Sequence, residues 1–126
     1  MTKSLNDLPG RHLGNPPPNA TGLVRQCHEL HRKPLSSMTP ADLRVLISQG
    51  FALDLLMPLA MQVLEKEPLI DTAYYPGDLF AAVLGVGASF WASRPNMRAS
   101  VEVLLDKAQP LPREVEKGLA AFRGTR

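Results

Sequence analysis

A nearly continuous apolar segment, Phe51 to Lys66, restricts the possible folds of this chain more than any other feature. Its large hydrophobic side chains fall on almost every side of a helix rather than on one stripe. A helix without a polar face is stable only where neighbouring helices cover it, so the segment predicts the centre of a helical bundle. Pro58 removes a backbone donor and predicts a kink or a break near Asp54 to Leu55.

Helix signals before this segment support the same class of fold. Residues 21–33 carry an apolar stripe at helical spacing that includes Leu23, with Asn19 or Thr21 as the expected cap. The run Thr39-Pro40-Ala41-Asp42 combines a capping hydroxyl, a proline at the first helical position and an acid at the third. Gly50 supplies the left-handed residue that ends this second helix.

Helix signals continue after the apolar segment. Further helices are predicted over residues 79–84, around Phe90 and Trp91, after Pro95, and from Val115 to Gly124. No stretch alternates with period two, so strands are not expected. The fold class predicted is therefore all-α, a compact single-domain bundle of five to seven helices around the central apolar helix.

The chain of 126 residues is long enough for one ordinary domain. Prolines and glycines concentrate in residues 1–18, which are predicted to be a flexible or extended proline-rich tail. Residues 19–124 are predicted to form the single helical domain. Because the N-terminus has no apolar signal region and the longest apolar stretch is too short for a bilayer, a cytoplasmic protein without membrane contact is expected.

Catalytic, metal and phosphate motifs find little support. Cys27, His28 and His31 offer too few ligands for a zinc site, and no G-x-S-x-G motif surrounds a serine. Gly85-Val86-Gly87 lacks the lysine and the spacing of a phosphate loop. Neither an enzyme, nor a metal or other cofactor, nor a small-molecule substrate is therefore expected.

Charge is small in total but unevenly distributed. The net charge of +2 does not argue for nucleic acid, and the basic residues are spread over several predicted helices. Residues 51–78 hold five acids against Lys66 alone, whereas both ends of the chain are mildly basic. The sequence therefore predicts an acidic central segment, residues 51–78, between two mildly basic ends.

Protein recognition is the class of function that remains. Tyr74 and Tyr75 lie on a predicted loop between two helices, flanked by Asp71 and Asp78. Loop tyrosines are frequent interface anchors, and an acidic rim steers a basic partner. The alternative is structural: the rings fold over the bundle and the residues up to Asp78 start a helix. The predicted partner-binding residues are Asp54, Glu65, Glu67, Asp71, Tyr74, Tyr75 and Asp78.

Two stretches together carry a family resemblance: residues 23–49, from Leu-Val-Arg-Gln-Cys-His to Leu-Ile-Ser-Gln, and residues 56–84, which include Tyr-Pro-Gly-Asp-Leu at 75–79. They resemble the helical immunity proteins of bacterial contact-dependent growth inhibition (CDI) systems. The resemblance implies a cytoplasmic protein that binds the C-terminal toxin domain of a cognate exoprotein, commonly a nuclease, and neutralises it by stoichiometric occlusion. The alternative function is a helical regulator or adaptor, with nucleic acid as one candidate contact. The oligomeric state is left open.

Overall fold

The computed structural model describes residues 3–123, and this part of the chain contains seven α-helices and no strand. The prediction of an all-α bundle of five to seven helices is confirmed. Two short 3-10 helices, Leu5–Asp7 and Leu35–Ser37, accompany the α-helices. The α-helices are α1 (Gly22–Leu30), α2 (Pro40–Ser48), α3 (Leu53–Lys66), α4 (Asp78–Leu84), α5 (Ala88–Ala92), α6 (Pro95–Lys107) and α7 (Arg113–Arg123).

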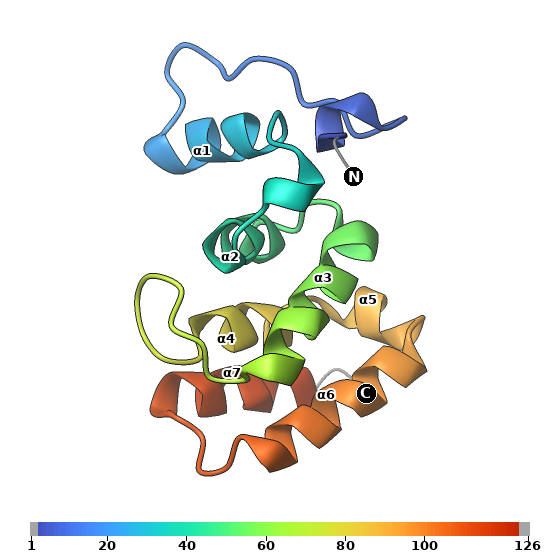
Figure 1. The fold of residues 1–126 in the computed structure, drawn as a ribbon, viewed down its shortest axis with the longest axis vertical. Helices are drawn as coiled ribbons and strands as arrows, with labels where there is room; N and C mark the ends of the chain where they lie inside the picture. The colour runs from blue at the N-terminus through green and yellow to red at the C-terminus, as the bar shows by residue number, and fades with distance from the viewer. Residues whose placement is uncertain (1–2, 124–126) are drawn as a thin grey trace.

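The helices form one elongated stack with α3 running through its middle (Figure 1). The N-terminal residues and α1 lie at one end, and α4 to α7 gather at the other (Figure 1). Helix α4 packs on both α7 and α2, and α2 packs on α3. The short helix α4 therefore links the C-terminal helix α7 to α2.

Helix α3 is central but less completely covered than its sequence predicts. Its inner face is buried through five apolar side chains: Leu56, Met57, Ala60, Met61 and Leu64. Asp54, Pro58 and Gln62, spaced four residues apart, are all exposed and form a stripe toward solvent. The helix is continuous through Pro58, so the alternative of a break is wrong. Proline leaves the Asp54 carbonyl without its helical donor, and both residues lie on the exposed stripe.

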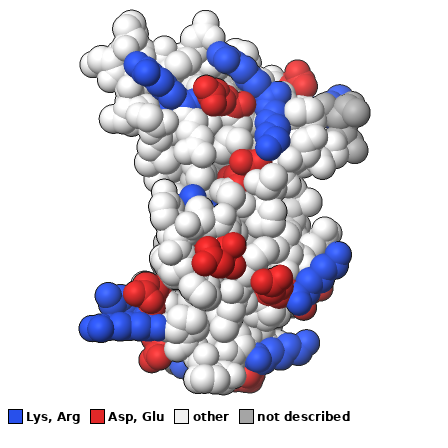
Figure 2. Space-filling model, turned by 60° about the vertical axis from the view of Figure 1, so that its left-hand side comes forward, with Lys and Arg blue, Asp and Glu red and all other residues white. Residues whose placement is uncertain are grey.

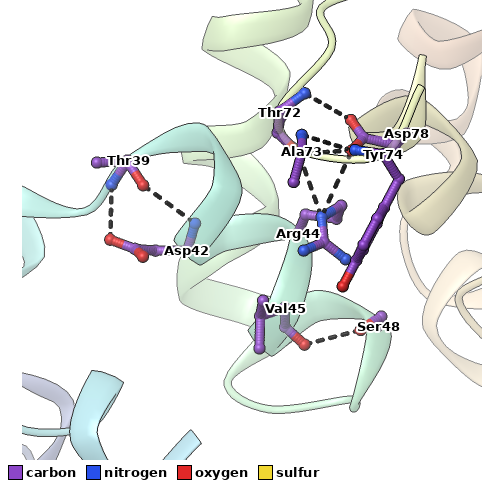
Figure 3. Close-up of polar contacts among 9 residues, drawn as sticks. All are labelled: Thr39, Asp42, Arg44, Val45, Ser48, Thr72, Ala73, Tyr74 and Asp78. Carbon is purple, nitrogen blue, oxygen red and sulfur yellow. Dashed lines mark hydrogen bonds and ion pairs between the residues drawn. The ribbon is translucent and has the colours of Figure 1, made fainter. Parts of the chain in front are cut away.

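The predicted helix ends are largely confirmed. The Thr21 hydroxyl accepts a hydrogen bond from the Val24 amide at 3.2 Å and caps α1. At α2, Thr39 accepts from the Asp42 amide at 3.2 Å while the Asp42 carboxylate accepts from the Thr39 amide at 3.0 Å (Figure 3). Gly50 has the expected positive φ, 79°. Within the predicted apolar stripe of α1, Cys27 and Leu30 are buried, whereas Leu23 is 43% exposed.

The N-terminal segment contributes to the core. Leu5 is fully buried within a 3-10 turn, although no regular element is predicted there. The Asn6 amide donates to the His31 carbonyl at 2.9 Å, so this turn lies against the end of α1. The division into a tail over 1–18 and a domain over 19–124 stays a prediction. The predicted helix end at Gly124 falls outside the described residues, as do residues 1 and 2.

Candidate functional site

One buried carboxylate holds the loop that carries the two tyrosines. We call residues 67–77, which join α3 to α4, the tyrosine loop. Asp78, the first residue of α4, is only 2% exposed. It accepts hydrogen bonds from the Thr72 amide (2.9 Å) and hydroxyl (2.8 Å) and from the amides of Ala73 (3.0 Å) and Tyr74 (3.1 Å) (Figure 3). Four donors from the loop therefore converge on one side chain.

These contacts keep Asp78 ionised. Burial raises the pKa of its carboxyl group, but the hydrogen bonds from Thr72, Tyr74 and Ala73 together lower it further, so the pKa lies below its ordinary value. Hydrogen bonds to a charged acceptor are shorter and stronger than neutral ones. The tyrosine loop is consequently a fixed surface at neutral pH.

Arg44 of α2 completes the cluster from the opposite side. Its Nε donates to the Thr72 hydroxyl at 3.1 Å and lies 3.6 Å from Oδ2 of Asp78. The guanidinium carbon lies 4.5 Å from the centre of the Tyr74 ring, which is a cation–π distance. Arg44 thereby links α2 to the tyrosine loop and supports the exposed ring of Tyr74.

The two tyrosines differ in exposure. Tyr74 is 74% exposed, whereas Tyr75 is half-buried. Burial raises the pKa of the Tyr75 hydroxyl, and the negative charges of Asp78 and Glu114 add to this rise. Beside both rings lies a hollow of about 250 Å³ between α2, α4 and the tyrosine loop, whose lining includes Arg44 and Ser48. An aromatic side chain and a cationic one thus border the same recess.

The structure brings some of the predicted partner-binding residues together and separates others. Asp71, Tyr74 and Tyr75 share the tyrosine loop, with Asp78 at its end. Asp71 pairs with Pro76 in an isolated bridge and is exposed. Glu65 and Glu67 are both exposed at the end of α3, but they border different hollows. The hollow beside Glu65 lies between α3 and α6, whereas the hollow beside Glu67 is lined by Leu35 and Ile70 among others.

Asp54 lies at the opposite end of α3 from the tyrosine loop. Eleven residues separate it from Glu65, which corresponds to roughly 16 Å along a helix axis. Both of its carboxylate oxygens are bound by Arg11, at 2.8 and 2.6 Å. The hydrogen bond from Arg11 is the main reason why the pKa of Asp54 is lowered. Asp54 is therefore engaged within the chain and does not adjoin the tyrosines.

Three residues beside Asp78 and the hollow were not predicted from the sequence: Arg44, Ser48 and Thr72. The only local signal lies in α2, where Arg44 stands between the buried residues Leu43 and Val45. A largely buried arginine needs a polar or charged partner. Its position could have marked it as a structural cation, but the partner itself is set by the packing of α2 on α4.

Surface charge follows the uneven distribution along the sequence. Figure 2 shows one face on which basic side chains lie mainly toward the two ends of the molecule, with acidic side chains also near its middle. The face is therefore mixed in charge rather than a single acidic field. Short-range complementarity will matter more there than the net charge.

Two of the histidines bind main-chain carbonyls within the chain. Nδ1 of His28 donates to the Gly14 carbonyl at 2.9 Å, and Nδ1 of His31 to the Cys27 carbonyl at 2.7 Å. Within residues 3–123, no three His, Cys, Asp or Glu side chains are grouped so that they could share a metal ion. Over the same residues, no helix has both the length and the apolar character needed to cross a membrane.

Comparison with known proteins identifies the family. No curated protein matches the chain. A family model described as CDI immunity proteins matches residues 7–101. The match runs from the N-terminal segment into α6 and includes α2, the tyrosine loop and Asp78. The resemblance carried by residues 23–49 and 56–84 is thereby confirmed, and the chain belongs to the family of CDI immunity proteins.

Proposed function

We propose that this protein binds the toxin domain of its cognate CDI exoprotein, a nuclease, and neutralises it stoichiometrically by occlusion, without turnover. Membership of the CDI immunity family is the observation that carries the proposal. An inhibitor of this type needs a dissociation constant of about 1 nM or lower, which corresponds to about −12 kcal/mol. A few well-buried anchors in an interface of ordinary size can supply that affinity.

The tyrosine loop is our proposed centre of the interface. Tyr74 has the largest exposure among the exposed large hydrophobic side chains of the described residues. The loop beneath it is already ordered by Asp78, so docking does not have to fix a mobile segment. A preorganised aromatic side chain loses little conformational entropy on binding and is therefore an effective anchor.

Exposed acids around the loop supply the proposed electrostatic rim. Glu65, Glu67 and Asp71 are exposed, and a nuclease surface that binds phosphates is basic. Opposite charges of this kind accelerate encounter and select against wrong partners. Asp54 would belong to the edge of the interface, because Arg11 already pairs with it. Asp78 would act indirectly, by holding the loop.

Co-purification with a tag on the toxin domain alone tests the proposal directly. The untagged protein should be retained at high salt, and titrating it into a toxin assay should abolish activity at a 1:1 ratio. Retention without loss of activity would contradict occlusion. Failure of two folded proteins to associate would contradict the proposed function itself.

Charge reversal locates the interface within such a complex. Asp71→Lys should slow association and weaken binding, because it places a cation beside the proposed contact with a basic surface. Asp106→Lys is the matched control, since Asp106 is also an exposed acid and lies on α6. Equal effects of the two variants on the association rate would move the interface away from the tyrosine loop.

A further inference from the structure

Arg44 keeps hydrogen-bond donors that the fold does not use. Its Nε is taken by the Thr72 hydroxyl and faces Asp78. Among residues 3–123, neither terminal nitrogen of Arg44 makes a hydrogen bond, and neither nitrogen is wholly sealed from solvent. Two adjacent donors of a charged group thus open into the hollow beside the tyrosine loop.

The guanidinium that carries these donors is fixed in place. The Arg44 side chain is only 15% exposed, its Nε edge is bound to the loop, and the Tyr74 ring covers one of its faces. Figure 3 shows the terminal nitrogens on the side of the guanidinium away from Asp78, toward Ser48 and the hydroxyl end of Tyr74. A partner would therefore meet a preset fork rather than a flexible side chain.

We propose that this fork binds one Asp or Glu carboxylate of the toxin domain, which enters the hollow lined by Arg44, Tyr74 and Tyr75. The inference rests on the proposed function and assigns the chemistry of one contact within it. Two parallel N–H donors match the two oxygens of a carboxylate, which is the geometry of a bidentate arginine pair. The hollow of about 250 Å³ is large enough for the end of one acidic side chain.

The negative charge of Asp78 does not exclude a second carboxylate. Asp78 lies at the Nε edge of Arg44, while the proposed carboxylate binds at the opposite edge. Four hydrogen bonds from the loop already stabilise the charge of Asp78. Asp78 and Thr72 thus position Arg44, and the terminal nitrogens of Arg44 make the contact.

This arrangement would determine specificity. A toxin that docks on the tyrosine loop removes water from the hollow. The two terminal nitrogens of Arg44 then need hydrogen-bond acceptors from the toxin. A toxin with a carboxylate at that point satisfies them, whereas a toxin with an apolar side chain buries two unpaired charged donors. One recessed cation beside the tyrosine loop would therefore discriminate between toxins of the same general charge.

Double-mutant cycles between the two full proteins test the contact. Arg44→Gln and Arg44→Lys are combined in turn with Asp→Asn and Glu→Gln variants of the toxin, and dissociation constants are measured. Arg44→Gln should weaken binding by about 30-fold or more, as expected for removing one partner of a desolvated charge pair. Arg44→Lys should recover only part of this loss, because a lysine has no fork. The matched control is Arg25→Gln on the exposed side of α1, which should leave the affinity unchanged.

The outcomes separate this inference from the proposed function. Strong coupling of Arg44 to one toxin carboxylate, with wild-type circular dichroism for the variants, supports it. Tight wild-type binding that neither Arg44 variant weakens overturns the contact and leaves the proposed function standing. A large loss that couples to no carboxylate also overturns it, because the loss then comes from a main-chain acceptor on the toxin or from the support that Arg44 gives to the tyrosine loop. Absence of binding by the wild-type protein overturns both.

Discussion

Replacing Asp78 by Asn tests whether one carboxylate holds the tyrosine loop. Asparagine has nearly the same shape but only one accepting oxygen, whereas the carboxylate uses both, Oδ1 for the Thr72 amide and Oδ2 for the other three donors. An amide oriented to serve the three donors turns its own N–H₂ group toward the Thr72 amide. The variant therefore loses one hydrogen bond outright and the charge that strengthens the rest.

The expected loss of stability is about 3 kcal/mol. A hydrogen bond to a charged group contributes roughly 1 kcal/mol more than a neutral one, and a buried donor without a partner costs about 1–3 kcal/mol. Three weakened bonds and one orphaned amide would sum to more than 3 kcal/mol. Removing a buried charge offsets part of this. Arg44 also loses the counter-ion that lies 3.6 Å away.

Acidification should reproduce the effect without a substitution. The pKa of Asp78 in the folded protein lies below its value of about 3.9 in an unfolded chain. Its contribution is therefore complete above the unfolded pKa and is lost as pH falls through the folded pKa. The difference in unfolding free energy between wild type and Asp78→Asn should be constant near neutral pH and shrink below about pH 4.

Urea denaturation followed by circular dichroism measures both quantities, with Asp106→Asn as the control for loss of one exposed acid. The control should change the unfolding free energy by less than about 0.5 kcal/mol. Amide hydrogen exchange at Ala73 and Tyr74 gives a local readout, because both amides lose protection if the loop opens. Equal stability of the two variants, with protection retained, would refute the role assigned to Asp78.

Three further changes test other features. Gly77→Ala should destabilise the protein by about 2 kcal/mol in urea denaturation, because Gly77 has φ 88° and a new Cβ would lie 2.5 Å from Val115 Cγ2; wild-type stability would contradict this packing. Tyr74→Ala should lower the unfolding free energy by only about 0.5 kcal/mol but weaken toxin binding by about 2 kcal/mol in calorimetry, as expected for an exposed anchor; unchanged affinity would remove Tyr74 from the interface. Leu5→Ala should cost about 3 kcal/mol in thermal or urea unfolding, because Leu5 is fully buried; a negligible effect would show that the N-terminal turn is dispensable.

Features fixed by neighbouring residues were predictable from the sequence. The cap of α2 needs only Thr39 and Asp42, and the turn after it needs only a left-handed glycine. Such signals act over a few residues and hold in any tertiary context. The number of helices and most of their ends follow from them, which is why the fold class was predicted correctly.

Features fixed by packing were not predictable in the same way. Asp78 stands at a helix start, where an acid normally caps its own helix, yet its carboxylate binds amides four to six residues earlier. That geometry exists because Gly77 turns the chain back and donates its own amide to Leu69 and Ile70. The pairing of Arg44 with Asp78 depends on α2 lying against α4, which no local pattern encodes.

The exposed stripe of α3 shows the same limit. Its polar positions are so few that Phe51 to Lys66 indicates burial all round, and only the arrangement of neighbouring helices decides which side is left uncovered. Asp54 illustrates the consequence for the site. Its acidity suggested a place in the partner surface, but the N-terminal segment folds back and supplies Arg11 to it.

The main-chain hydrogen bonds that hold the tyrosine loop determine which substitutions the loop can accept in evolution. Two of the groups that bind Asp78 are main-chain amides of residues 73 and 74, so the side chains at these positions take no part in the hydrogen bonds to Asp78. Any residue except proline supplies the same amide. New side chains can therefore appear at the tip of the loop without altering its shape. The protein can therefore adapt to changes in the toxin by single substitutions at the tip of the loop. Such substitutions change the side chains that the toxin contacts but leave the main-chain hydrogen bonds to Asp78 in place.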